Sequence, residues 1–304
     1  MPNTVELTLD PACLARVEAY AALKRKTVAE IVNDRLREIG DDFVEAALPR
    51  GACRTHIVMQ RHEGRDTTAS YLRNGRWDEF EQPLPAHLYN WVRRDPGLVI
   101  DGGANTGFYA LLAANAHADV AVLAFEPDPL VRGLLLANLE ANRLGNRIQV
   151  SEAALHDETG SAPLYVPPDE FGVIETSSSL EPRFKDRHAQ VITVPTVTVD
   201  AAAGGRRVTA MKLDLAGHET EALHGAGRTV AADRPLIIIE ALDRADFGEL
   251  SAFIARHEYM DVPLRAGETL TAQAAVTFEK HAWNHALVPA EKLPRFLLLG
   301  RAEG

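Results

Sequence analysis

The sequence has few cysteines, no excess of basic residues and no long apolar segment, and each shortage excludes a class of protein. Its two cysteines, Cys13 and Cys53, lie in different segments without metal-type spacing, which predicts a disulfide-free protein of the cytosol. The formal net charge is −11, so a nucleic-acid surface over the whole chain is not expected. No apolar run approaches about 20 residues and the first residues lack the pattern of a signal peptide, so we expect a soluble, cytoplasmic protein.

The sequence also lacks a G-x-G-x-x-G motif, but residues 98–129 hold a different glycine-rich turn. The apolar run from Leu98 to Ile100 predicts a buried strand, and a helical pattern starts after the turn. A second apolar run then ends at Phe125 and is followed by an acid and a proline. This order predicts an α/β fold, a doubly wound Rossmann-like sheet with its ligand crevice at the carboxyl ends of the strands.

The acids of this stretch suggest the ligand. Glu126 at the end of the second strand suits hydrogen bonds from a ribose diol, and it follows Asp101 by 126 − 101 = 25 residues, near the roughly 20 expected. Asp101 would repel the phosphates of a dinucleotide but would attract an ammonium group. S-adenosylmethionine (SAM) combines adenosine with a methionyl amine and has no phosphate, so it fits both ends.

Three parts of the chain are distinguished. Residues 1–42 read as strand, helix, helix, resemble ribbon-helix-helix modules, and carry equal numbers of basic and acidic residues up to Gly40. We interpret this unit as a dimerisation element that makes a homodimer; a cap over the active site or DNA binding are the alternatives. Residues 43–96 precede the first strand of the predicted core and could supply a wall of the substrate pocket. Residues 97–304 form the SAM-binding domain. We expect residues 167–190 to form a lid.

Residues from about 97 to 242 resemble the FkbM-type SAM-dependent methyltransferases. The matching segments include IDGGANTGFYALLAA, AFEPDP and MKLDLAGHETEALHGAG. The resemblance implies a class I methyltransferase fold, SAM as cofactor with S-adenosylhomocysteine as product, and a role in tailoring natural products or polysaccharides. One departure is that the family's D-x-E-G-x-E pattern is met by Asp214-Leu215-Ala216-Gly217-His218-Glu219, which lacks the first acid.

Candidate site residues follow from the turn, the strand ends and the resemblance. His218 is the first candidate for a general base toward an acceptor hydroxyl, with Asp214 orienting it or acting directly. A divalent metal at Asp214, His218, Glu219 and Glu240 is a weaker alternative that the missing acid disfavours, and no metal is assigned. The cofactor-binding candidates are Asp101, Gly102, Gly103, Asn105, Phe108, Glu126, Pro127, Ala153 and Asp214.

Polar side chains inside two predicted elements need partners. The strand from Val208 to Asp214 places Lys212 and Asp214 on one face, and a buried lysine requires an acid or a hydrogen-bond acceptor. Asn138 and Asn142 lie four residues apart on one helix face, where they either steady the turn after Glu126 or face solvent.

These observations favour a SAM-dependent methyltransferase that methylates an oxygen of a small or medium-sized, natural-product or sugar-like metabolite. Two other functions remain open from the residues alone. One is an NAD(P)-linked oxidoreductase on the same architecture, which Asp101 in the turn disfavours. The other is a ligand-sensing regulator that binds DNA through residues 1–42, which the acidic net charge disfavours.

Overall fold

The computed structural model describes residues 43–48, 55–60, 68–69, 83–168, 176–185 and 187–299. The predicted ribbon-helix-helix unit, residues 1–42, lies outside the described residues, so the unit and the homodimer built on it stay predictions. Among the described residues, no helix combines the length and apolar character needed to cross a lipid bilayer.

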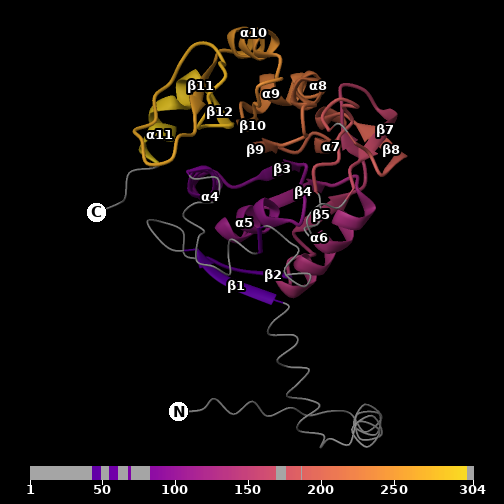
Figure 1. Ribbon diagram of the computed structural model, residues 1–304. Helices are drawn as coiled ribbons and strands as arrows, with labels where there is room; N and C mark the ends of the chain where they lie inside the picture. Colours follow the sequence, from indigo (N-terminus) through magenta and orange to yellow (C-terminus); the bar gives the residue numbers. More distant parts are fainter. Residues whose placement is uncertain are drawn as a thin grey trace, which may run out of the picture.

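A mixed sheet of seven strands forms the centre of the described structure (Figure 1). In spatial order the strands are β11 (Tyr259–Pro263), β12 (Asn284–Pro289), β10 (Leu236–Glu240), β9 (Val208–Leu213), β3 (Leu98–Gly102), β4 (Ala121–Phe125) and β5 (Ile148–Ser151). The five strands from β10 to β5 run parallel. Their residues are apolar because both faces of a parallel sheet are covered by helices, which confirms the predicted α/β class.

The last strand departs from the simple doubly wound order. The two strands that follow β10 add an antiparallel pair at its edge of the parallel strands, where β12 lies between β10 and β11 and is antiparallel to both. The strand that forms the edge is β11. The insertion gives β10 a paired strand on each side; its apolar residues 236–239 are buried, whereas Glu240 at its end is partly exposed.

Helices cover the two faces of the sheet and form two separate cores. The helices α4 (Leu84–Arg94), α5 (Phe108–Ala116) and α6 (Pro129–Ala141) pack on one face, and α11 (Leu293–Leu298) joins them through Phe296. The other face is covered by α7 (Val199–Ala203), α8 (Glu219–His224), α9 (Gly227–Asp233) and α10 (Phe247–His257). A short 3-10 turn, η3 (Ala290–Lys292), precedes α11.

A smaller three-stranded sheet lies beside the carboxyl end of the main sheet. Its order is β6 (Ala154–Leu155), β8 (Gln190–Val197) and β7 (Gly160–Val166). The strand β6 follows β5 after two residues, so the small sheet continues directly from the third core strand. This connection places the segment between β7 and β8 next to the predicted crevice.

Asn138 of α6 and Asn142, which caps the end of this helix, use their side chains to hold another part of the chain. A hairpin of β1 (Phe43–Leu48) and β2 (Thr55–Gln60) packs against α5 and α6. The Asn138 side chain accepts from the Gln60 N–H at 2.7 Å and donates to the Thr106 carbonyl at 2.7 Å. Asn142 accepts from the Val58 N–H and donates to the Val58 carbonyl. The two asparagine side chains therefore make hydrogen bonds to the backbone groups along the outer edge of β2, where another strand would otherwise pair.

Candidate functional site

The turn after β3 approaches β9 so closely that only glycine fits at its start. Gly103 has a φ of +68°, and a Cβ on it would lie 1.9 Å from the Asp214 carbonyl oxygen. The N–H groups of Gly103 and Ala104 both donate to the Phe125 carbonyl, at 3.0 and 2.9 Å. The turn is thereby fixed to the ends of both neighbouring strands.

Glu126, at the end of β4, is held by backbone groups on two sides. One oxygen of its carboxylate accepts from the Asn105 N–H at 2.9 Å, and the other accepts from the Asp128 N–H at 3.0 Å. Burial raises the pKa of Glu126 to about 7, against the lowering effect of these two hydrogen bonds. The side chain is 6% exposed, so its position is defined before any ligand binds.

Lys212 and Asp214 form the pair that the strand pattern required. The Lys212 ammonium donates to the Asp214 carboxylate at 3.0 Å and lies over the ring of Tyr109. Lys212 is buried, whereas the Asp214 side chain keeps 33% of its surface. Asp214 therefore remains accessible at the end of β9 while it neutralises a buried cation.

A cavity of about 790 Å³ lies at the carboxyl ends of the parallel strands. Of the predicted site residues, Gly103, Asn105, Glu126, Pro127, Asp214 and His218 line it. Glu240 at the end of β10 lines it too, together with Arg244 and Trp283 farther along the chain. Four strand ends and a glycine turn thus converge on one ligand-sized space, as expected for a doubly wound sheet.

Four predicted cofactor residues do not line this cavity. Asp101 is 1% exposed within β3, Phe108 packs in the core on α5, and Gly102 lies against Leu155 and Leu213. The wall expected at Ala153 is formed by the next residues, Ala154 and Leu155. The acid that the cavity receives from the β3–β9 region is therefore Asp214 and not Asp101.

The segment 176–185, within the predicted lid, lies across the cavity and contacts three strand ends. Thr176 accepts a hydrogen bond from the Asn105 side chain at 2.8 Å, and Ser178 donates to the Asp128 carboxylate at 2.8 Å. Ser179 donates to the Ala216 carbonyl at 2.8 Å. The segment therefore connects the turn after β3, the end of β4 and the loop after β9.

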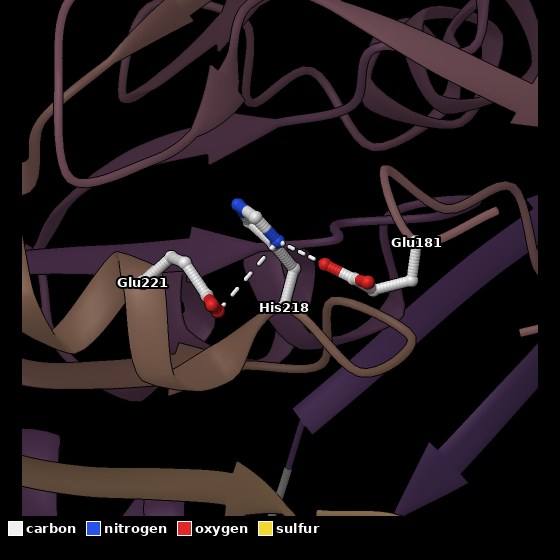
Figure 2. A group of neighbouring side chains, drawn as sticks. All are labelled: Glu181, His218 and Glu221. Atoms are coloured by element: carbon white, nitrogen blue, oxygen red, sulfur yellow. Dashed lines mark hydrogen bonds and ion pairs between the residues drawn. The ribbon is translucent and has the colours of Figure 1, made fainter. Parts of the chain in front are cut away.

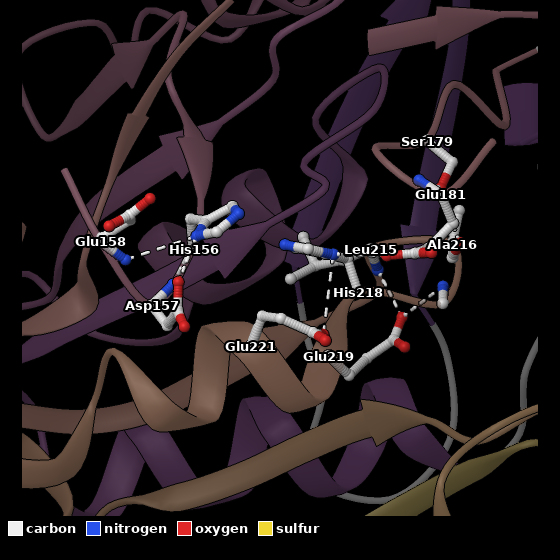
Figure 3. A network of polar contacts seen from close by, with 11 residues as sticks. His156, Asp157, Glu158, Ser179, Glu181, Leu215, Ala216, His218, Glu219 and Glu221 are labelled. Atoms are coloured by element: carbon white, nitrogen blue, oxygen red, sulfur yellow. Dashed lines mark hydrogen bonds and ion pairs between the residues drawn. The ribbon is translucent and has the colours of Figure 1, made fainter. Parts of the chain in front are cut away.

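His218 precedes α8 and is paired with glutamates instead of Asp214 (Figures 2 and 3). Its Nδ1 lies 2.9 Å from Glu181 of the 176–185 segment and 3.6 Å from Glu221 of α8. Its Nε2 is buried and has no hydrogen-bond partner among the described residues, and its ring packs on His156 at 4.7 Å. The expected orientation of His218 by Asp214 is thus replaced by Glu181, since Asp214 bonds Lys212.

Glu219 also lines the cavity, and one of its carboxylate oxygens supports the loop after β9. One of its oxygens accepts from the N–H groups of Leu215 and Gly217, at 2.7 and 3.3 Å (Figure 3). These bonds hold a turn in which Ala216 and Gly217 have φ values of 54° and 97°. Burial raises the pKa of Glu219 to about 7. The metal-ligand set considered from the sequence therefore does not converge.

Sequence reasoning missed Glu181 and Glu221 as neighbours of His218. Glu181 lies 37 residues before the histidine, in a segment without periodicity. Glu221 follows His218 by three residues, a spacing that brings side chains together on a helix. The three-residue spacing could therefore have predicted, from the sequence, that Glu221 lies next to His218.

Comparison with solved structures found methyltransferases at TM-scores below 0.5. A methyltransferase FkbM from Methylobacillus flagellatus KT is 17% identical with a TM-score of 0.44, covering 64% of this chain and 44% of that one. A methyltransferase from Geobacter sulfurreducens is 14% identical with a TM-score of 0.41, covering 73% and 86%.

Two relatives match by sequence over shorter stretches. The 31-O-demethyl-FK506 methyltransferase FkbM of Streptomyces tacrolimicus is 38% identical over 134 residues, which is 42% of this chain and 45% of that protein. Methyltransferase sdnD of Sordaria araneosa is 29% identical over 89 residues, covering 29% and 33%. The matched region spans less than half the length of either relative.

The family model of the methyltransferase FkbM domain matches residues 101–263, which include the end of β3, the strands β4, β9 and β10, and every cavity-lining residue except Trp283. Those 163 positions (263 − 101 + 1) are more than half of the 304 residues. The chain belongs to the FkbM methyltransferase domain family.

Proposed function

We propose that this methyltransferase uses SAM and transfers its methyl group to an oxygen of a small or medium-sized metabolite. The observation that carries the proposal is the single cavity onto which Gly103, Glu126 and Asp214 converge. These three supply a backbone turn at the cavity wall, a fixed acceptor for hydroxyl groups and a partly exposed carboxylate. Together they match the sugar and the ammonium group of SAM.

The residues of the cavity fit the parts of SAM. Each Glu126 oxygen accepts one backbone hydrogen bond and keeps a further lone pair for a ribose hydroxyl. The absence of a side chain at Gly103 lets the turn lie against the Asp214 carbonyl, and Asp214 offers a carboxylate to the methionyl ammonium. SAM supplies an electrophilic methyl group on a sulfonium.

The chain's own contribution to methyl transfer is alignment. The cavity is also lined by Glu240, Arg244 and Trp283, which combine hydrogen-bonding groups with an aromatic surface. Such a lining can hold a polar acceptor at a fixed distance from the methyl carbon, and alignment supplies much of the rate of an in-line displacement. The 176–185 segment, lying across the same space, would exclude water from it.

Transfer to oxygen is supported by the relative from Streptomyces tacrolimicus, whose name specifies a 31-O-demethyl substrate. The charged lining also favours an acceptor with hydroxyl groups, of natural-product or sugar-like character. Among the three functions left open by the residues, membership of a methyltransferase family favours this one over the NAD(P)-linked oxidoreductase and the DNA-binding regulator.

Calorimetric titration with SAM and with NAD⁺ tests the cofactor. We expect SAM to bind and NAD⁺ not to bind. Glu126→Gln should weaken SAM binding by about 10-fold or more, because one buried acceptor of the diol is replaced by a donor. The matched control is Glu152→Gln, whose side chain is 69% exposed and lies outside the cavity lining. NAD⁺ binding without SAM binding would overturn the proposal.

A screen for methyl acceptors tests the transfer itself. The protein and SAM are incubated with hydroxylated, amine and carboxylate acceptors, and S-adenosylhomocysteine is measured. We expect it to form with hydroxylated acceptors. If S-adenosylhomocysteine forms with amines alone, the acceptor atom is nitrogen and not oxygen. The assignment of SAM as the cofactor would still hold.

A further inference from the structure

Glu181, His218 and Glu221 form a cluster of donor atoms beside the cavity (Figure 2). One ligand atom from each residue lies within 4.8 Å of the others. The residues come from two parts of the chain, since Glu181 belongs to the 176–185 segment and the other two lie at the start of α8. Both Glu181 and His218 also line the cavity.

The spacing of these atoms matches the coordination shell of a divalent cation. Ligands about 2.1 Å from a metal, at angles between octahedral and tetrahedral, lie roughly 3.0–3.4 Å from one another. The His218 Nδ1 lies 2.9 Å from the Glu181 Oε1 and 3.6 Å from the Glu221 Oε2. The ligand atoms of the two glutamates lie within 4.8 Å of each other, so a cation could lie between the three residues after the flexible carboxylates shift toward it.

The charge and the burial of the cluster also favour a bound cation. Within the described part of the chain, the ion pairs of Glu181 and Glu221 go only to His218, and no lysine or arginine pairs with either. The two glutamates are 42% and 38% exposed, whereas the His218 side chain is 7% exposed. Two carboxylates thus converge on a rigid, buried imidazole, and its other nitrogen, Nε2, has no partner among the described residues.

We propose that Glu181, His218 and Glu221 bind a divalent cation that accepts mixed nitrogen and oxygen ligands, with Zn²⁺ or Mn²⁺ as the favoured ions. An imidazole ligand is typical of these metals, whereas Mg²⁺ and Ca²⁺ take oxygen ligands. The set shares only His218 with the ligands considered from the sequence, because Asp214 and Glu219 have other partners.

The position of the cluster assigns the cation a role at the acceptor. Its open coordination positions would face the cavity and take an acceptor hydroxyl oxygen, whose proton is then lost to water more easily. This role rests on the proposed function, but the binding of the metal does not. The cation would also join the 176–185 segment to α8, since Glu181 and Glu221 belong to one each.

The test is calorimetric titration of chelator-treated full-length protein with ZnCl₂ and, separately, MnCl₂, without SAM. We expect saturable binding of one ion per chain and a raised melting temperature. Glu221→Gln and Glu181→Gln should each weaken binding by at least about 10-fold. Both side chains are partly exposed, so the variants should fold; circular dichroism checks this.

The matched control is Glu249→Gln. Glu249 pairs with His224 at 3.0 Å, so it has the same chemistry as Glu181, but it does not line the cavity. Metal affinity should be unchanged in this variant. Equal affinity in all variants, or no saturable binding by the unmodified chain, would overturn the inference and leave a histidine–glutamate hydrogen bond.

The SAM titration separates this inference from the proposed function. SAM binding without metal binding overturns the metal site and retains the methyltransferase proposal. Metal binding without SAM binding retains the metal site and overturns the methyltransferase proposal. The two outcomes can be told apart because the metal titration contains no cofactor.

Discussion

The two sides of the cavity are built differently. On the side of β3 and β4, polar groups are fixed by backbone: Glu126 by two N–H groups, and the Gly103 turn by the Phe125 carbonyl. On the side of β9 and the 176–185 segment, side-chain to backbone contacts are joined by pairs of side chains, as in Glu181 with His218. The contacts of the first side join two consecutive core strands, whereas those of the second join a long loop to the residues that follow β9.

This difference matches the two substrates of the proposed reaction. A cofactor of constant shape can be bound by a turn whose geometry is set within a few residues. An acceptor that differs between enzymes is better met by side chains on loops, because these change without disturbing the sheet. We therefore expect the effects of substitutions on the two sides to differ both in the property that changes and in the size of the change.

The largest contrast is expected between Gly103→Ala and Gly217→Ala. Both glycines have positive φ, but a Cβ on Gly103 meets the Asp214 carbonyl at 1.9 Å, whereas one on Gly217 meets only side chains at 3.5 Å. The first change adds overpacking to backbone strain and should lower the free energy of unfolding by roughly 2–5 kcal/mol. The second should lower it by about 1–2 kcal/mol. Urea denaturation measures both, and equal effects would contradict the difference between the two sides.

Buried acids on the two sides should affect stability alike. Burial raises the pKa values of Glu126 and Glu219 from 4.5 to about 7. The unfolded chain releases these protons near pH 4.5 and the folded chain near pH 7, so the stabilisation is full below pH 4.5 and is lost as the pH rises through 7. Each acid should account for about 3 kcal/mol of that loss.

Glu126→Gln and Glu219→Gln should each flatten the pH dependence of the free energy of unfolding, measured by urea denaturation from pH 4.5 to 8. Glu152→Gln is the exposed control and should keep the full slope. A slope unchanged in both variants would show that neither acid ionises late in the folded chain.

Cofactor affinity should depend on pH through the β4 side only. As the pH rises from 6 to 8, Glu126 changes from mostly protonated to mostly ionised, since its pKa is about 7. The ionised form accepts hydrogen bonds from a diol, so SAM affinity should rise by up to about 10-fold. Calorimetry should find this rise in the unmodified chain and in Glu219→Gln but not in Glu126→Gln. A rise retained in Glu126→Gln would assign the dependence to another group.

The smallest effect is expected for Ser178→Ala, which removes one contact between the two sides. Its hydroxyl donates to Asp128 at 2.8 Å from a partly exposed position. Thermal unfolding should show a loss of about 0.5–1.5 kcal/mol. Ser161→Ala, at an exposed position of β7, should show no change. A loss well above this range would indicate that the 176–185 segment stabilises the fold itself.

Prediction from sequence succeeded where the deciding interactions are local. The strand, turn, helix, strand and acid of residues 98–126 formed as expected, because apolar runs and glycines limit each element within a few residues. The pairing of Lys212 with Asp214 followed from strand periodicity and the cost of burying a lone charge. The order of β12 and β11 did not follow, because either order leaves the same apolar pattern along each strand.

The sequence by itself determined an α/β methyltransferase fold, a turn that requires glycine, and an acid at the end of β4. The tertiary structure decided that Asp101 lies outside the cavity lining while Asp214 faces the cavity, and that Glu181 reaches His218 across 37 residues. The physical reason is how far apart in the sequence the interacting residues lie. Backbone conformation and apolar periodicity are set by neighbours in the chain, whereas the direction in which a strand-end side chain points, and the partner it meets, depend on how distant segments pack.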